Sequence, residues 1–123
     1  MKKLLHRSML AAVIVSCSPV NAVEQSDVDQ FTAMLKQISV CDRHAKLAYV
    51  VMASRQMSDD FVDAIVAGRM VAESYNDLNE DDIHHYAYDS FNYPRKLNGH
   101  DKSAYANGYK KLVYEDCLKG YGY

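Results

Sequence analysis

The chain has 123 residues, which is enough for one domain. It contains 14 basic and 16 acidic residues, so its net charge is −2 when histidine is neutral, and it has no tryptophan. This acidic balance argues against a nucleic-acid binder, which needs a basic face, and against electrostatic binding to anionic lipid headgroups.

Residues 1–22 have the pattern of an export signal. Residues 1–7 are basic, residues 9–15 form a short apolar run, and Val20-Asn-Ala22 supplies the small residues of a cleavage site. The alternative, a retained membrane anchor, needs ~20 apolar residues to span a bilayer. Cleavage after Ala22 would leave 11 basic against 16 acidic residues, a net charge of −5. The pattern therefore predicts a periplasmic protein without a transmembrane segment in its mature chain.

A second processing route competes with this one. Ile14-Val15-Ser16-Cys17 resembles a bacterial lipobox, in which the cysteine is lipidated and becomes the new N-terminus. Ser18 after that cysteine is typical of sorting to the outer membrane. In this alternative the protein is an outer-membrane lipoprotein that faces the periplasm, with its lipid anchor on Cys17.

Two cysteines, Cys41 and Cys117, lie beyond the export signal. In an oxidising compartment two such thiols are most simply a disulfide, and the alternative is a pair of buried free thiols. A catalytic dithiol is disfavoured because the chain has no Cys-x-x-Cys sequence. The interpretation is a Cys41–Cys117 bridge that holds the end of the chain against an early helix.

The first predicted helix covers about residues 27–56 and is capped at Ser26. Residues 23–30 are a polar lead-in to the domain and include the first turn of this helix. Whether it is one helix or is broken at Ser39-Val40 stays open. Apolar residues spaced three and four apart place one stripe toward the core. The stripe consists of Phe31, Leu35, Ile38, Cys41, Ala45, Ala48 and Met52.

Three more helices follow at helical spacing of apolar residues. They are residues 59–76 capped by Ser58, residues 79–93 capped by Asn79, and residues 102–119 capped by Asp101. Gly68, inside the first of the three, indicates a close contact between helices, and Asn107-Gly108 is a turn signal inside the last. Gly120 is the predicted stop, and residues 120–123 form a loose tail.

No stretch alternates apolar and polar residues long enough to predict a strand. The predicted fold is all-α, with about four helices in a small bundle over residues 31–119. The bridge between Cys41 and Cys117 clamps this bundle, so the first and last helices should touch there and run antiparallel.

The same segments resemble a group of small exported proteins with two cysteines in Proteobacteria and their phages. The resemblance covers about residues 38–119. It is carried by Cys41-x-x-x-Ala45-x-x-Ala48-x-x-x-Met52-x-x-Arg55-Gln56, by Ala72-Glu-Ser-Tyr75, by Tyr93-Pro-Arg95 and by Tyr114-x-x-Cys117-Leu-Lys119. The resemblance implies the helical fold and the disulfide. No activity is assigned to the group, so it implies no catalytic residue and no cofactor.

Two sets of side chains are candidates for binding. Asp81, His84 and His85 share one helix face, where a carboxylate and imidazoles can hold Zn²⁺ or Cu²⁺ weakly; the alternative is a solvated first turn. Ten tyrosines are present, and those off the main stripes suit a binding face; the alternative is ordinary packing at the rim of the core. These are Tyr49, Tyr88, Tyr93 and Tyr114, joined in one version by Tyr121 and Tyr123.

The predicted function follows from these features. No catalytic motif is present, so we expect no enzyme but an exported protein that binds another envelope protein, as an inhibitor, accessory subunit or exclusion factor. A periplasmic acid-stress chaperone is the first alternative, because the carboxylates and histidines change charge on acidification. A weak metal-binding protein is the second. The partner is not identified by the sequence.

Overall fold

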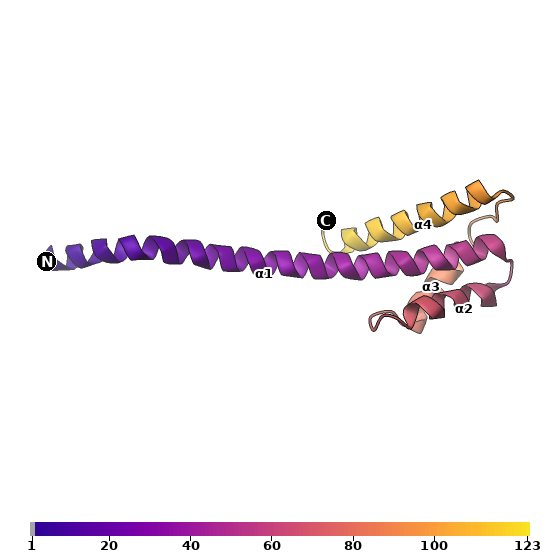
Figure 1. Cartoon of the computed structure of the whole chain (residues 1–123), viewed down its shortest axis with the longest axis horizontal. Coiled ribbons are helices and arrows are strands. Elements are labelled where there is room, and N and C mark those ends of the chain that lie inside the picture. The colour runs from indigo at the N-terminus through magenta and orange to yellow at the C-terminus, as the bar shows by residue number, and fades with distance from the viewer. Residues whose placement is uncertain (1) are drawn as a thin grey trace. The chain divides into compact units, whose positions relative to one another are not determined.

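The structure is a computed structural model that describes the backbone of residues 2–123 and the side chains of residues 24–123. Within these residues it contains four helices and no strand. They are α1 (Lys2–Met57), α2 (Phe61–Ala72), α3 (Glu80–Ser90) and α4 (Gly99–Gly120) (Figure 1). The predicted all-α class is therefore confirmed.

The chain divides into two compact units, Met1–Lys36 and Gln37–Tyr123. In the first unit the predicted helix start after Ser26 is wrong, because residues 23–30 are already helical and contain no proline or glycine that would end a helix. Phe31 and Leu35, expected on the inward stripe, are 55% and 49% exposed. In the second unit α1 continues through Ser39-Val40 without a break.

The two predicted processing sites precede the first side chain that the structure describes, that of Glu24. The side chain of Cys17 and the predicted cleavage motif before Val23 fall outside the described side chains. Within the described part of the chain, no helix has the length and apolar character needed to cross a membrane.

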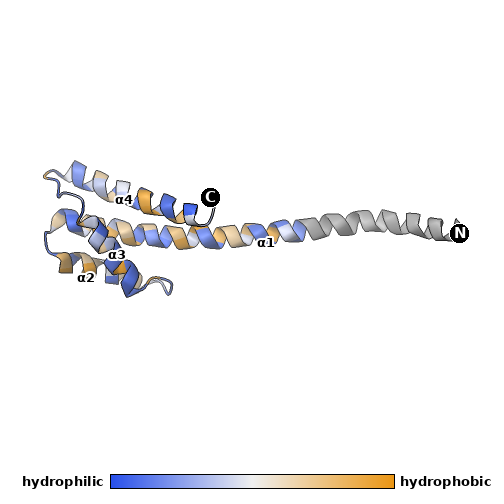
Figure 2. Ribbon diagram, turned by 180° about the vertical axis from the view of Figure 1, so that it is seen from behind, coloured by the Kyte–Doolittle hydropathy of each residue, from blue (hydrophilic) through white to orange (hydrophobic). Residues whose placement is uncertain are grey.

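The unit Gln37–Tyr123 is built on the C-terminal part of α1. Leu47 and Val51 on α1 join an apolar cluster with α2 and α3, while Ala48 and Met52 join a second cluster with α4. α2 carries mainly hydrophobic residues, as Figure 2 shows. The two clusters use adjacent faces of α1, so α2 and α3 lie on one side of it and α4 on another (Figure 1).

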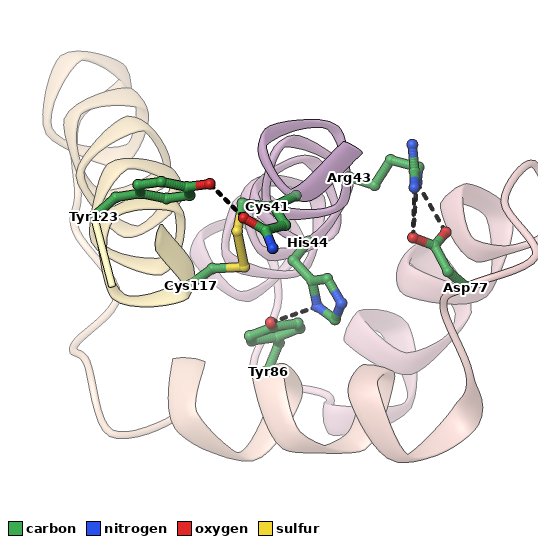
Figure 3. The surroundings of a disulfide bond; sticks show 8 residues. Cys41, Arg43, His44, Asp77, Tyr86, Cys117 and Tyr123 are labelled. Carbon is green, nitrogen blue, oxygen red and sulfur yellow. Dashed lines mark hydrogen bonds and ion pairs between the residues drawn. A yellow bond between two sulfur atoms is a disulfide. The ribbon is translucent and has the colours of Figure 1, made fainter. Parts of the chain in front are cut away.

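A disulfide joins α1 to the last turn of α4. Cys41 and Cys117 are bonded with a Cα–Cα distance of 5.5 Å, and Cys41 is fully buried (Figure 3). α4 runs back along α1 in the opposite direction, as Figure 1 shows. The predicted bridge and the antiparallel arrangement of these two helices are confirmed.

Gln56 fastens the other end of α4 to α1. Its buried side chain donates from Nε2 to the carbonyl of Pro94 at 2.9 Å, and its Oε1 accepts from the backbone N–H of Lys96 at 2.8 Å. Its own carbonyl accepts from Arg95 Nε at 3.1 Å and from Lys102 Nζ at 2.7 Å. These bonds satisfy acceptors at the C-terminus of α1, where cations are favoured by the helix dipole.

The predicted N-terminal cap is correct for α3 and wrong for α2. Asn79 caps α3, as predicted, and also forms a capping box with Asp82. The cap of α2 is Asp60 and not Ser58, because the Asp60 carboxylate accepts from the N–H of Val62 at 2.9 Å. Ser58 instead accepts from the N–H of Asp60 and donates to Asp63, so it shapes the turn before the helix.

The ends of α4 also differ from the prediction. Asn98 is its cap and accepts from the N–H of Asp101, the residue that was predicted to cap. At the other end Gly122, and not Gly120, has the positive φ of a helix stop. The N–H of Tyr123 donates to the Leu118 carbonyl, and the Tyr123 hydroxyl bonds to Gln37 (Figure 3). The last residues are therefore hydrogen-bonded, where a loose tail was expected.

Gly68 marks the close approach between α2 and its neighbours. A Cβ at this position would lie 2.8 Å from Ile83 Cγ2 and 3.2 Å from Val51 Cγ2. We expect Gly68→Ala to lower the free energy of unfolding by roughly 1 kcal/mol, because overpacking outweighs the gain in helix propensity. Gly108→Ala is the matched control, since a Cβ there meets nothing within 4 Å. It should raise stability in the same urea titration, and equal effects of the two changes would contradict this packing.

The disulfide closes a loop with a sequence separation of 76 residues. Replacing both Cys41 and Cys117 with serine should therefore lower the free energy of unfolding by about 4 kcal/mol through loop entropy. Urea unfolding with and without dithiothreitol measures this loss. The double variant should not respond to the reductant, and native protein with two freely alkylated thiols would show that the bridge is absent.

Candidate functional site: two adjoining cavities along α4

Two adjoining cavities open along α4. The first, here called the tyrosine cavity, has a volume of about 460 Å³. It is lined by Met52, Tyr93, Ala104, Tyr105, Gly108, Tyr109 and Leu112. The second, here called the acidic cavity, has a volume of about 350 Å³ and shares Leu112 with the first. It is lined by Val40, His44, His85, Tyr86, Asp89, Leu112, Val113, Asp116, Cys117 and Tyr121.

Helical spacing explains why these side chains face one groove. Tyr105, Tyr109, Leu112 and Asp116 are four, three and four residues apart, so they lie along one face of α4. α3 contributes to the acidic cavity alone, where His85 and Asp89 are one turn apart. The groove therefore changes along its length from aromatic to charged.

The walls of the tyrosine cavity are packed aromatic rings. The Tyr93 ring lies edge-on to Tyr105, with centroids 6.2 Å apart, and is tilted against Tyr109 at 5.8 Å. The ammonium group of Lys96 lies 5.0 Å from the centroid of Tyr105. Ala104 and Gly108 contribute little volume, so this part of the groove stays open to an apolar or aromatic group.

Tyr109 bridges the two helices at the centre of the groove. Its buried ring ends in a hydroxyl that donates to Asp89 Oδ2 at 2.9 Å and lies 3.3 Å from the carbonyl oxygen of Tyr86. Burial, followed by the hydrogen bond to Asp89, raises the pKa of Tyr109 far above its usual value. The phenol of Tyr109 therefore stays protonated and remains the donor in its hydrogen bond to Asp89.

The floor of the acidic cavity carries a histidine and a tyrosine. His44 Nδ1 on α1 lies 2.8 Å from the hydroxyl of Tyr86 on α3 (Figure 3). Burial raises the pKa of Tyr86 to about 12, with a smaller contribution from the charge of Asp82. The ring of His85 lies edge-on to the ring of Tyr86, with centroids 5.2 Å apart.

The tyrosines predicted to form one binding face are distributed over the molecule. Tyr93 lies in the tyrosine cavity, where it meets Tyr105 and Tyr109. Tyr88 is 67% exposed and stacks against Phe61 at 4.8 Å.

The other two predicted tyrosines lie near Lys110. Its ammonium group is 5.9 Å from the ring centroid of Tyr49, and Tyr114 lines a separate cavity with Lys110. Of the two added C-terminal tyrosines, Tyr121 lines the acidic cavity and Tyr123 bonds to Gln37.

The predicted metal ligands are not brought together as a site. Asp81 is exposed in the first turn of α3, and His84 Nδ1 lies 2.8 Å from the backbone carbonyl oxygen of Glu80. His85 faces the acidic cavity instead. Among residues 24–123, no three His, Cys, Asp or Glu side chains are gathered so that they could hold a metal ion.

Sequence reasoning missed most of the groove. The predicted binding face includes only Tyr93 and Tyr121 of the side chains that line the two cavities, and it omits Tyr105, Tyr109, Asp89 and Asp116. The available signal was the repeat of Tyr105, Tyr109, Leu112 and Asp116 along one helix face. That repeat alone does not reveal which helix faces it.

No family model, curated protein or solved structure matches the chain. What the groove can bind is therefore argued from the residues that line it. One end offers aromatic and apolar surface, and the other end offers carboxylates and imidazoles. This combination suits the recognition of a ligand that has an apolar part and a polar part.

The raised pKa values give a spectroscopic test. We expect Tyr86 and Tyr109 to remain protonated at pH 11, where a free tyrosine phenol is mostly ionised, because both are buried. Absorbance at 295 nm during alkaline titration follows this ionisation. Tyr86→Phe and Tyr109→Phe should each remove part of the late-titrating signal.

The raised pKa values of Tyr86 and Tyr109 also determine whether alkaline pH stabilises or destabilises the fold. Since both pKa values are higher in the folded state than in the unfolded state, the free energy of unfolding should fall as the pH rises above about 10. Late signal that persists in the double phenylalanine variant would show that other tyrosines carry it.

Proposed function

We propose that this chain is an exported helical protein that binds another protein of the cell envelope through the tyrosine cavity. Export is supported by the signal pattern of residues 1–22 and by the Cys41–Cys117 disulfide, which suits an oxidising compartment. Cleavage after Ala22 and lipidation at Cys17 both deliver the protein to the periplasmic space. The resemblance to small exported two-cysteine proteins supports the same location.

The tyrosine cavity is the observation that carries the binding role. Tyr93, Tyr105 and Tyr109 surround an open volume of about 460 Å³. Tyrosine combines a large apolar ring with a polar tip and loses little conformational entropy, so it is enriched where proteins bind each other. Leu112, at the border of the cavity, is 45% exposed and adds apolar surface.

The disulfide and the bonds of Gln56 make this surface suitable for binding. They fix α4 to α1 at both ends of the cavity, at Cys117 and at Lys102. A surface that is held in place before a partner arrives loses less entropy on binding. The cavity is thus a preformed docking site for a side chain of the partner.

Affinity capture with a blocking variant tests this proposal. Gly108→Phe adds a ring into the tyrosine cavity without removing any contact, because a Cβ there meets nothing within 4 Å. We expect the exported wild-type protein to capture a discrete envelope protein, identified by mass spectrometry, and Gly108→Phe to lose at least about tenfold in captured amount.

Glu115→Phe is the matched control. It adds the same ring on an exposed position of α4 outside both cavities, and capture should persist. Equal capture by the two phenylalanine variants would place the binding surface elsewhere. Failure of the wild-type protein to capture any envelope protein would contradict the binding role itself.

A further inference from the structure

We propose that the acidic cavity receives the side chain of a lysine or arginine from the same partner segment whose apolar side chain occupies the tyrosine cavity. This inference rests on the proposed function, because it names the chemistry of the partner at the same groove. The two cavities share Leu112, and Tyr109 of the first donates a hydrogen bond to Asp89 of the second. One bound polypeptide segment can therefore place side chains in both.

The carboxylates of the cavity are the first argument. Asp89 on α3 and Asp116 on α4 line it from opposite walls. Asp89 accepts from the neutral hydroxyl of Tyr109, which leaves its negative charge in place. Among the side chains that the structure describes, neither carboxylate forms an ion pair, and no lysine or arginine lines the cavity. The cavity therefore presents negative charge that a cation would balance.

The aromatic and imidazole groups are the second argument. Tyr86 and Tyr121 present ring surface to the cavity, and tyrosine faces attract ammonium and guanidinium groups. The same interaction occurs inside this chain, where Lys96 lies 5.0 Å from the ring centroid of Tyr105. His85 adds an imidazole from α3 to the lining, while the imidazole of His44 is hydrogen-bonded to the Tyr86 hydroxyl. A basic side chain thus finds carboxylates on α3 and α4 together with aromatic rings.

The net charge of the chain also favours one kind of binding partner over another. Without residues 1–22 the chain has a net charge of −5 with histidine neutral, so two copies repel each other. A basic segment of another protein is attracted by the same charge. The structure therefore favours a partner segment with an apolar residue near a lysine or arginine over a second copy of this chain.

A display library of random heptapeptides provides the probe. The oxidised, exported protein is panned against it at fixed salt and in the presence of EDTA. We expect the enriched peptides to pair an apolar or aromatic residue with a lysine or arginine, and Gly108→Phe to reduce their binding. A selected peptide with arginine should bind the wild-type protein at least about tenfold more tightly than the same peptide with neutral citrulline.

Matched variants locate the cation. Asp89→Asn combined with Asp116→Asn should abolish the preference for arginine, and asparagine still accepts the bond from Tyr109. Asp81→Asn combined with Glu115→Gln removes two charges from exposed positions of the same two helices. This control should keep the preference, since neither residue lines the cavity.

The outcomes separate the two proposals. Enriched peptides that lack a basic residue but still depend on Gly108 would overturn the inference and leave the proposed function intact. Enrichment of acidic peptides would also overturn it. If no peptide binds in a way that depends on Gly108, or if the protein forms a dimer that Gly108→Phe disperses, both proposals fail.

Discussion

α4 is held to α1 at two points, and the rest of the second unit depends on this attachment. Cys117 is bonded to Cys41 near one end, and Lys102 donates to the carbonyl of Gln56 near the other. The apolar contact between the two helices is small, since its buried members are Ala48, Met52, Ala106, Tyr109 and Val113. So modest a cluster supplies little stabilisation by burial alone, and a covalent tie compensates by restricting the unfolded chain.

The placement of α4 in turn creates the groove. Ala45 and Ala48 on α1 and Ala106 on α4 are buried and small, which lets the two helices approach closely. α3 lies on α1 beside the other cluster, and the Tyr109 hydroxyl reaches across to Asp89. This bond joins α3 to α4 through side chains, and on either side of it the cavities remain open. The groove is thus a consequence of two helices packing on adjacent faces of a third.

The sequence predicted the elements better than their contacts. Apolar spacing placed all four helices, and the cysteine count predicted the bridge, because both depend on local pattern and on compartment. The caps at Asp60 and Asn98 were missed because Ser58 and Asp101 are equally good cap residues by type. Arg55-Gln56 and Tyr93-Pro94-Arg95 were noticed only as motifs. Their meeting at the C-terminus of α1 depends on residues about 38 apart, which periodicity does not reveal.

Two small residues of α4, Ala104 and Gly108, leave the tyrosine cavity open. Gly108 and Ala104 lie on the wall that α4 presents to Tyr93, and a Cβ on Gly108 would meet no other atom within 4 Å. A glycine inside a helix costs up to ~1 kcal/mol relative to alanine, and no close packing here repays that cost. At Gly68 the opposite holds, because Ile83 and Val51 leave no room for a side chain. One glycine is therefore explained by the fold. The other leaves aromatic surface uncovered at a cost in stability, and the binding role proposed above would account for that cost.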